Sequence, residues 1–301
     1  MNPFEYNLPN YKIEEKLIDS NNCWSRYSVS FPAARPTAYS EQNTVLGEYY
    51  RLKSAGRHPL VLLVHSLGDS STIPCRMFAR DLAKKGIACF IIFLVFHSRR
   101  MPAAIKKKMP FLSSDEWFDG YRTSVIDIRQ VLDWAGQKEE IDPGKISVTG
   151  ISLGGIISAI SMGVDRRISA GTFIVSGGNY ESRTWLQRWP NKYSDSECAA
   201  AGEMYLKFLN EASSRGFENV DAPKKSYFTD PVTYAYLLRG RPMQMINARW
   251  DERIPRQSSV DMWESLGKPP IAWYPATHAL VWLYYHSISS RVLDFLSAAC
   301  R

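Results

Sequence analysis

The segment that most constrains the fold is the pentapeptide Gly150-Ile151-Ser152-Leu153-Gly154, which lies between a short apolar run and a run of small residues. The preceding run, Ile146-Ser147-Val148, follows a Pro-Gly turn signal and predicts a short strand. The small and apolar residues from 154 to 160 predict a buried helix. Glycines around a serine permit a sharp strand-to-helix turn, which lifts the serine hydroxyl clear of the sheet. We therefore expect Ser152 at the edge of a β-sheet, between a strand and the helix that packs on it.

Two glycines and a serine at this spacing also occur by chance, so the rest of the chain decides what the pentapeptide means. The run Pro59–Val64 predicts a buried strand, and residues 72–85 suit an amphipathic helix that ends at Gly86. The ten residues Ile87–Phe96 are apolar and predict a second buried strand, because a membrane-spanning helix requires about 20 residues. These three segments form one β-α-β unit.

Strand-like and helix-like segments alternate along the remaining chain. Residues 23–31 and 44–53 are predicted as leading strands, and Ser113-Ser114-Asp115-Glu116 offers a capping box for a long helix. The aromatic stripe of that helix, which begins with Trp117 and Tyr121, is interpreted as core packing. Further elements are predicted at 170–175, 243–247, 256–266, 271–274 and 281–295. This alternation predicts an α/β fold with a mainly parallel central sheet, flanked by helices, and binding groups at the carboxyl ends of its strands.

The chain is expected to form a single domain over residues 1–301, since no linker rich in proline and glycine divides it. Residues 1–55 form an N-terminal extension with the leading strands. Residues 179–235 interrupt the alternation with a polar and aromatic stretch that contains Trp185, Trp189 and a predicted helix over 198–212. We interpret this stretch as a small helical insertion that forms a cap over the active site.

Composition excludes several classes of protein. The chain is 45% hydrophobic and 22% charged, as expected of a soluble globular protein, and the first residues show no secretory signal, so we expect a cytoplasmic protein. The five cysteines are scattered, without a CxxC pair, which predicts neither a disulfide framework nor a zinc site. The net charge of +7 is interpreted as solvated surface, because no nucleic-acid-binding motif accompanies it. We expect no metal, no cofactor, no nucleic-acid partner and no membrane span, and the oligomeric state stays open.

A nucleophilic serine needs a base, because its hydroxyl is protonated at neutral pH. Of the five histidines, His278 lies in a short loop after the strand predicted over 271–274, from which an imidazole can return to the serine. The imidazole in turn needs an acceptor. Asp251 follows the strand predicted over 243–247 at the same sheet edge, and Glu252 and Asp230 are its rivals.

Three segments together resemble the α/β-hydrolase superfamily: the pentapeptide around Ser152, the segment 247–255 and the loop Thr277-His278. The resemblance covers about residues 57–298 and is greatest to bacterial esterases related to dienelactone hydrolases and acetyl xylan esterases. The order Ser152, Asp251, His278 is that of α/β-hydrolases. The resemblance implies the α/β-hydrolase fold, with these residues as nucleophile, acid and base.

An oxyanion hole requires two backbone N–H donors. Leu153, directly after the serine, offers one. The family's second donor comes from a His-Gly-x-Gly loop, which here reads His65-Ser66-Leu67-Gly68, so similarity assigns the donor to Leu67 while Ser66 replaces a glycine. His65 itself is interpreted as structural.

Trp250, His97 and Trp185 are the candidate substrate-binding residues. The neighbouring Arg99 and Arg100 could bind a substrate carboxylate or form a structural salt bridge. The resulting hypothesis is a carboxylic ester hydrolase that acts on a small-molecule ester through an acyl-enzyme. Dienelactone hydrolases use a cysteine nucleophile, so the serine favours simple esters. Amide, thioester or peptide cleavage, acyl transfer and a non-catalytic ligand-binding homologue are the alternatives.

Overall fold

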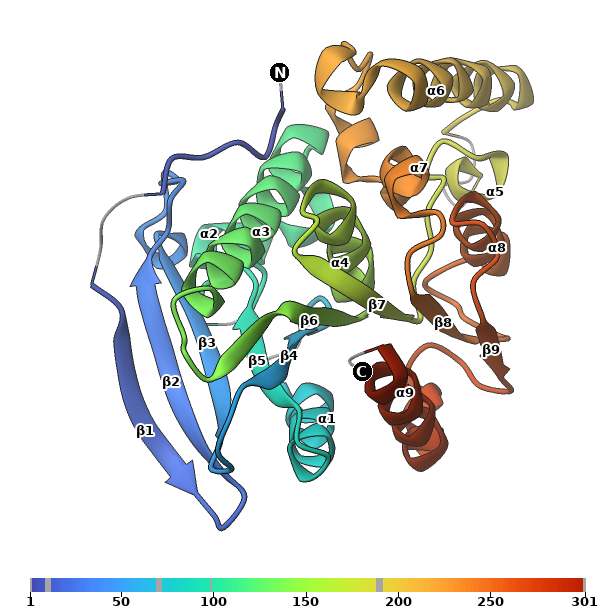
Figure 1. Cartoon of the computed structure of the whole chain (residues 1–301). Helices are drawn as coiled ribbons and strands as arrows, with labels where there is room; N and C mark the ends of the chain where they lie inside the picture. Colours follow the sequence, from blue (N-terminus) through green and yellow to red (C-terminus); the bar gives the residue numbers. More distant parts are fainter. Residues whose placement is uncertain (1, 9–11, 69–71, 98, 188–191, 300–301) are drawn as a thin grey trace.

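A nine-stranded sheet runs through the molecule in the order β1-β2-β3-β5-β4-β6-β7-β8-β9 (Figure 1). The computed structural model describes residues 2–8, 12–68, 72–97, 99–187 and 192–299. Strands β1 to β3 pair antiparallel, β3 pairs antiparallel with β5, and all pairs from β5 to β9 are parallel. The strands are β1 (Glu14–Ser20), β2 (Trp24–Pro32), β3 (Thr44–Leu52), β4 (His58–Val64), β5 (Ala88–Phe93), β6 (Ile141–Ile151), β7 (Ile168–Ile174), β8 (Met243–Ala248) and β9 (Ile271–Tyr274).

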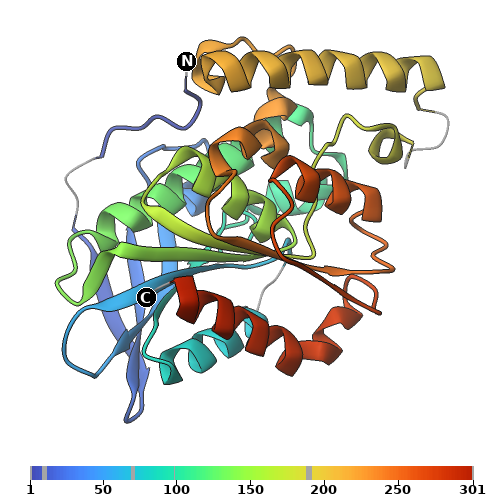
Figure 2. The ribbon, with the colours of Figure 1, turned by 45° about the vertical axis from the view of Figure 1, so that its right-hand side comes forward.

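Helices cover both faces of this sheet (Figures 1 and 2). One face carries α1 (Ile73–Lys84) and α9 (Tyr285–Ala299), which pack against each other. The opposite face carries α3 (Ser114–Ala135), α4 (Leu153–Val164) and α8 (Arg256–Ser265). The predicted capping box at the start of α3 is present, because the side chain of Ser113 accepts from the Glu116 N–H and the Glu116 carboxylate accepts from the Ser113 N–H.

The segment between β7 and β8 corresponds to the predicted insertion. It contains α5 (Arg183–Leu186), α6 (Asp195–Arg215) and α7 (Ala235–Leu238), and α6 lies across the top of the molecule in Figure 2. The ring of Tyr227 packs at 4.7 Å from the ring of Tyr205 and at 5.1 Å from that of Phe208, so α6 has an aromatic core of its own. The short elements elsewhere are α2 (Ala103–Lys108) and the 3-10 helices Ser40–Gln42, Met109–Phe111, Phe217–Asn219, Lys225–Thr229, Pro231–Tyr234 and Leu280–Tyr284.

The structure differs from the sequence predictions at three places. Strand β1 was not predicted, because six of its seven side chains are exposed and its pattern EEKLIDS shows no apolar alternation. The strand predicted over Ile87–Phe96 ends at Phe93, since Leu94 and Phe96 are buried in the turn that follows. The turn predicted before Ile146 lies within β6, where the register against β4 shifts and the Asp142 carboxylate accepts from the Gly144 N–H.

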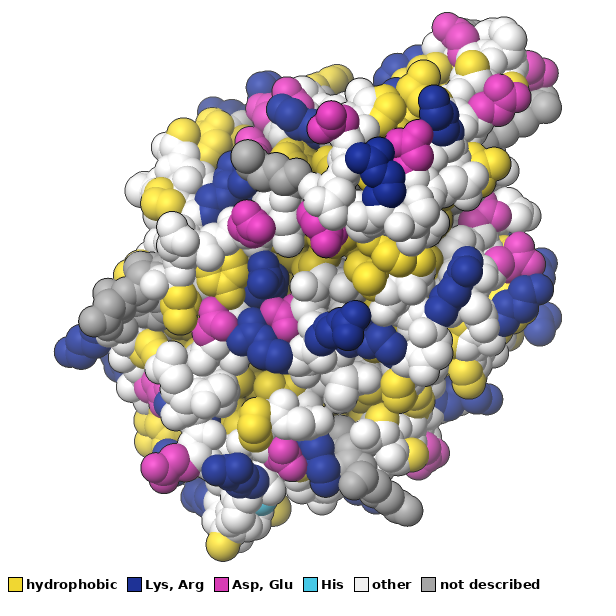
Figure 3. All heavy atoms as spheres, turned by 45° about the horizontal axis from the view of Figure 1, so that its top comes forward, with side chains coloured by type: hydrophobic (Ala, Val, Ile, Leu, Met, Phe, Trp, Pro, Cys, Tyr) yellow, Lys and Arg dark blue, Asp and Glu magenta, His cyan; other side chains and the backbone are white. Residues whose placement is uncertain are grey.

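The surface does not concentrate charge on the face that Figure 3 shows. Lys and Arg side chains are interspersed there with Asp and Glu. On this face, the net charge of +7 is therefore not gathered into a basic patch. Within the ranges that the structure describes, no helix is long and apolar enough to cross a bilayer.

Candidate active site

Ser152 occupies the sharp turn between β6 and α4. Its backbone has φ 54° and ψ −118°, a left-handed conformation that is strained for any residue except glycine. Its N–H donates to the carbonyl oxygen of Ile174 at 2.8 Å, which fastens the turn to the end of β7. The turn therefore holds Ser152 at the carboxyl edge of the sheet.

The two glycines of the pentapeptide are required for close packing. A Cβ atom on Gly150 would lie 2.2 Å from the carbonyl oxygen of Gly154, and a Cβ atom on Gly154 would lie 2.3 Å from the carbonyl oxygen of Val64. Both contacts are with backbone atoms, which cannot move aside as a flexible side chain can. Glycine at these positions lets α4 start directly against the end of β4.

Ser152, His278 and Asp251 form a continuous hydrogen-bonded chain. The His278 Nε2 atom lies 3.0 Å from the Ser152 Oγ atom, and the Nδ1 atom lies 2.7 Å from Oδ2 and 2.9 Å from Oδ1 of Asp251. The side chains of His278 and Asp251 are buried, with 10% and 4% of their surface exposed. A carboxylate at Nδ1 favours the tautomer with its proton there, which leaves Nε2 free to accept the serine proton.

The loop after β8 is folded around the Asp251 carboxylate. The Oδ1 atom accepts hydrogen bonds from the backbone N–H groups of Arg253 at 2.9 Å and Ile254 at 2.8 Å. Such bonds fix the direction of the carboxylate before any substrate binds. The loop therefore presents Asp251 to the imidazole in one orientation.

The two rival carboxylates have other partners. Glu252 accepts from the backbone N–H of His278 at 2.9 Å, and this hydrogen bond lowers the pKa of Glu252. Asp230 is buried and accepts from the N–H groups of Asn179, Tyr180 and Val232. Burial raises the pKa of Asp230 to about 6, although these hydrogen bonds oppose the shift. Asp230 thus fastens the segment that follows β7, and among these three carboxylates Asp251 is the one that bonds to the imidazole ring of His278.

The two predicted oxyanion donors, Leu153 and Leu67, both line the cavity that contains Ser152. Leu153 is the first residue of α4, so its N–H has no intrahelical partner. The ring of His65 holds the neighbouring loop, because its Nδ1 atom bonds to the Ser66 carbonyl oxygen at 2.7 Å and its Nε2 atom accepts from the Leu94 N–H at 3.0 Å. His65 therefore has the structural position that was expected.

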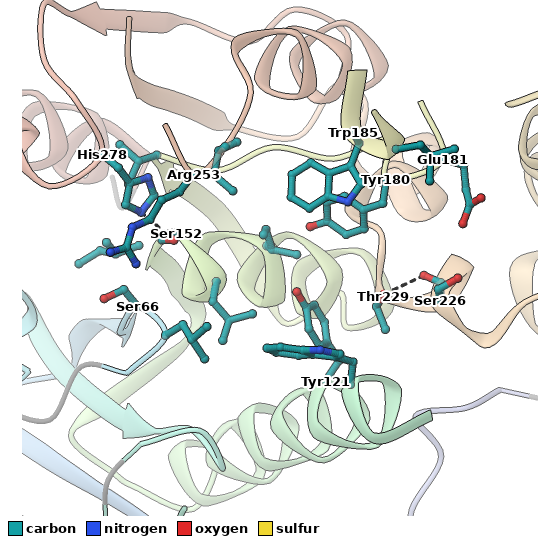
Figure 4. Close-up of a pocket in the computed structure, with 18 of the residues that line it drawn as sticks. Ser66, Tyr121, Ser152, Tyr180, Glu181, Trp185, Ser226, Thr229, Arg253 and His278 are labelled. Carbon is teal, nitrogen blue, oxygen red and sulfur yellow. Dashed lines mark hydrogen bonds between the residues drawn. The ribbon is translucent and has the colours of Figure 1, made fainter. Parts of the chain in front are cut away.

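A cavity of about 680 Å³ opens at Ser152 (Figure 4). This volume is in the range of pockets that enclose a whole small molecule. Its aromatic lining residues are Trp117, Tyr121, Tyr180, Trp185, Tyr193 and Trp282. Its aliphatic lining residues include Ile151, Leu153, Ile156, Val175, Leu186 and Ile254. The polar lining residues besides Ser152 and His278 include Ser66, Glu181, Ser226, Thr229 and Arg253.

The predicted substrate-binding residues are divided by the structure. Trp185 lines the cavity. Trp250 does not, and 63% of its surface is exposed to solvent. His97 does not line it either, because its ring is buried and stacks on Phe93 at 4.4 Å. Trp189 lies outside the described residues.

Trp117 and Tyr121 were predicted to pack in the core, and Tyr121 does belong to the core with Trp117 packed against it, but both also line the cavity. Their helical spacing was correct, but α3 passes under the site, so only the later part of the stripe, from Val125 onward, is fully buried. Tyr180 and Arg253 were missed as lining residues, since both lie in irregular segments without periodicity. The position of Arg253 two residues after Asp251 was the one signal available.

Arg100 forms a structural salt bridge, which was the alternative to binding a substrate carboxylate. It is fully buried and forms an ion pair with Asp127 at 2.7 Å, and it also donates to the carbonyl oxygens of Phe93 and Gln42. The guanidinium of Arg99 lies 5.3 Å from the centre of the Phe93 ring. In the described part of the chain, no group of three His, Cys, Asp or Glu side chains is arranged to hold a metal ion.

A nine-stranded, mostly parallel sheet with helices on both faces and a serine on a strand-to-helix turn defines the α/β-hydrolase fold, as the sequence predicted. Residues 40–176 match the model of the family described as alpha/beta hydrolase domain containing 18. No curated protein sequence matches the chain.

Solved esterase structures share this architecture. The structure of acetyl xylan esterase 1 from Thermoanaerobacterium sp. JW/SL YS485 is similar with a TM-score of 0.68 at 15% identity, over 95% of this chain and 89% of that one. A cold-adapted esterase from an Arctic intertidal metagenomic library is similar with a TM-score of 0.63 at 15% identity, over 97% and 100%. The structure of acetyl xylan esterase from Paenibacillus sp. R4 is similar with a TM-score of 0.62 at 14% identity, over 95% of this chain and 89% of that one. At these identities, the likeness is one of fold.

Proposed function

We propose that the protein is a serine hydrolase of carboxylic esters. The observation that carries the proposal is the hydrogen-bonded chain in which His278 lies 3.0 Å from the Ser152 Oγ atom and 2.7 Å from the Asp251 carboxylate. The esterases among the structural relatives support the same reaction class. Segment 179–235 is proposed to act as a cap, because Tyr180, Trp185, Ser226 and Thr229 from this segment line the cavity.

The reaction follows from this geometry. The Ser152 hydroxyl attacks the ester carbonyl carbon while the His278 Nε2 atom takes its proton, and the Leu153 and Leu67 N–H groups stabilise the oxyanion. The tetrahedral intermediate collapses as the imidazolium gives this proton to the leaving alcohol, and the acyl group stays on Ser152. A water molecule then loses a proton to His278 and attacks the acyl carbon. The bond between the acyl carbon and the Ser152 Oγ atom breaks as the imidazolium gives the proton to Oγ, and the carboxylic acid leaves. Asp251 keeps the imidazole oriented and stabilises its cationic form in both halves of the reaction.

Hydrolysis of p-nitrophenyl acetate by the purified protein tests this proposal. We expect turnover that falls by at least about 10³-fold in the Ser152→Ala variant, since only oxyanion stabilisation and binding persist without the nucleophile. A fluorophosphonate should label the wild type and spare Ser152→Ala. Ser213→Ala, on the exposed side of α6, is the matched control and should be labelled like the wild type.

Undiminished turnover in Ser152→Ala would refute the mechanism. A panel of amide, thioester and ester donors with a competing alcohol or amine separates ester hydrolysis from the related acyl-transfer reactions that the same three residues can support. A protein that binds esters but shows neither labelling nor turnover would instead be a ligand-binding homologue.

A further inference from the structure

The cavity beyond Ser152 has two aromatic walls that come from different parts of the chain. Trp117 and Tyr121 lie one turn apart on α3, with their rings 6.4 Å apart. Tyr180 and Trp185 belong to the segment that follows β7, and their rings are 4.8 Å apart. Figure 4 shows Tyr121 on one side of the cavity and Tyr180 with Trp185 on the other. A planar group that approaches from the Ser152 side, up to the point where the Tyr121 and Tyr180 hydroxyls meet, can contact aromatic rings of both walls.

The two walls also present polar groups to each other. In Figure 4 the hydroxyl groups of Tyr121 and Tyr180 face each other. The two hydroxyls interact with each other, and that of Tyr180 also donates to the Gly177 carbonyl oxygen at 3.5 Å. Burial raises the pKa of both tyrosines, so both hydroxyls stay protonated at neutral pH and can exchange hydrogen bonds with a polar substituent. Ser226 and Thr229 line the cavity beyond the tyrosines, and the nearby Glu181 carboxylate is neutralised by Lys224 at 2.7 Å. This end of the cavity suits a neutral polar substituent.

The position of His278 indicates which half of an ester enters the aromatic slot, the part of the cavity between the Trp117–Tyr121 and Tyr180–Trp185 walls. The leaving alcohol receives its proton from the Nε2 atom, so it departs on the His278 side of Ser152. Figure 4 shows the aromatic walls on the opposite side of Ser152 from His278 and set apart from the serine. The acyl group therefore faces the walls, and aliphatic residues such as Leu153 and Ile156 also line the cavity.

We propose that the cavity selects an acyl group in which a short linker joins the ester carbonyl to an aromatic ring with a hydroxyl substituent. The linker would lie among the aliphatic side chains, the ring between the Trp117–Tyr121 and Tyr180–Trp185 walls, and the substituent at the two tyrosine hydroxyls. This inference names the substrate class of the proposed esterase and rests on that function for its catalytic part. It is tested separately by binding.

A series of p-nitrophenyl esters with one leaving group measures the acyl preference. We expect kcat/KM for the 3-phenylpropanoate to exceed that for the hexanoate by about tenfold, because aromatic contacts add stabilisation beyond buried area. The 3-(4-hydroxyphenyl)propanoate should be better again by a few fold. A hexanoate hydrolysed as well as the phenylpropanoate would overturn the inference, while hydrolysis of the acetate ester would still support the proposed function.

Two variants assign the preference to the walls. Trp185→Leu should lower the ratio of aryl to alkyl kcat/KM severalfold, whereas Trp273→Leu on edge strand β9, where the ring stacks with Arg256, should leave the ratio unchanged. The double variant Tyr121→Phe/Tyr180→Phe keeps both rings. It should hydrolyse the 3-(4-hydroxyphenyl)propanoate no better than the 3-phenylpropanoate, while it still prefers the aryl esters to the hexanoate. A hydroxyl advantage that persists in this variant would contradict the role of the tyrosines.

Binding to the Ser152→Ala variant separates the slot from the chemistry. Methyl 3-(4-hydroxyphenyl)propanoate should quench tryptophan fluorescence at a concentration at least about tenfold below that needed for methyl hexanoate. If no ester is hydrolysed but this preference holds, the proposed function fails and the aromatic slot stands. If both methyl esters bind alike, the slot is refuted whatever the activity.

Discussion

Glu252 accepts a hydrogen bond from the backbone N–H of His278, with 2.9 Å between the nitrogen and Oε2. The residue next to it, Asp251, contacts the ring of the same histidine. Two consecutive carboxylates thus hold His278, one through its ring and one through its backbone. Glu252 is a positioning residue, because its bond fixes the loop from which the imidazole reaches Ser152.

Glu252→Ala should lower kcat/KM for p-nitrophenyl acetate by up to about tenfold. A hydrogen bond to a charged group contributes about 1.5 to 3 kcal/mol, and the 54% exposure of the Glu252 side chain reduces this value. Glu252→Gln keeps an acceptor and should come closer to the wild type. Glu264→Ala, at an equally exposed helix position, is the control. Equal activity of Glu252→Ala and the wild type would exclude the positioning role.

Gly154→Ala should destabilise the protein by about 1 to 3 kcal/mol and reduce activity, because the new methyl group meets the Val64 carbonyl oxygen at 2.3 Å. Gly136→Ala is the matched control. Its Cβ atom would lie at ordinary contact distances of 3.5 Å and more, and its φ of −64° suits alanine. Chemical denaturation of both variants measures the difference, and a Gly154→Ala protein as stable as Gly136→Ala would refute the packing argument.

The buried ion pair of Arg100 and Asp127 predicts non-additive mutations. Removing one partner leaves a buried charge, so Asp127→Leu and Arg100→Met should each cost about 3 to 5 kcal/mol of unfolding free energy. The double variant Arg100→Met/Asp127→Leu should cost less than either single change, because it leaves no charge in the core. A double-mutant cycle by urea denaturation checks this expectation, which additive costs would contradict.

Asp230 should make stability depend on pH. Its pKa rises from 3.8 to about 6 on folding, so the folded protein binds the proton more tightly than the unfolded chain. The resulting stabilisation is complete below about pH 4 and is lost as the pH rises through 6, by roughly 3 kcal/mol. Other groups titrate in this window, so the comparison needs a variant.

The unfolding free energy of the wild type minus that of the Asp230→Asn variant should therefore decrease between pH 4 and pH 7. The exposed Asp221→Asn variant is the control and should follow the wild-type curve. Parallel curves for the wild type and Asp230→Asn would show that this carboxyl does not titrate as expected.

The mainly parallel sheet was accessible from the sequence because most residues of strands β4 to β8 are buried and these strands are read as apolar runs between helices. Strand β1 was not accessible, since backbone pairing with β2 holds it while its side chains face solvent. Periodicity reports burial, and it fails where hydrogen bonds alone maintain a strand.

The same limit applies to the site. Ser152, Asp251 and His278 could be proposed because each follows a predicted strand at one sheet edge, and the structure brings the three together. Apart from Trp185, the cavity walls could not be proposed, because a helical aromatic such as Tyr121 has the same spacing whether it faces a core or a pocket. Which of the two it faces depends on the insertion, whose path no local pattern encodes.

The left-handed backbone of Ser152 lowers the stability of the folded protein at the residue that the proposed reaction requires. A φ of 54° costs about 1 to 3 kcal/mol for a residue with a side chain, and glycine would relieve it. Ser152→Gly should therefore raise the melting temperature, whereas Ser152→Ala, which keeps the strain, should not. Selection of this chain for heat resistance alone should therefore favour the replacement of Ser152, the proposed nucleophile, by glycine.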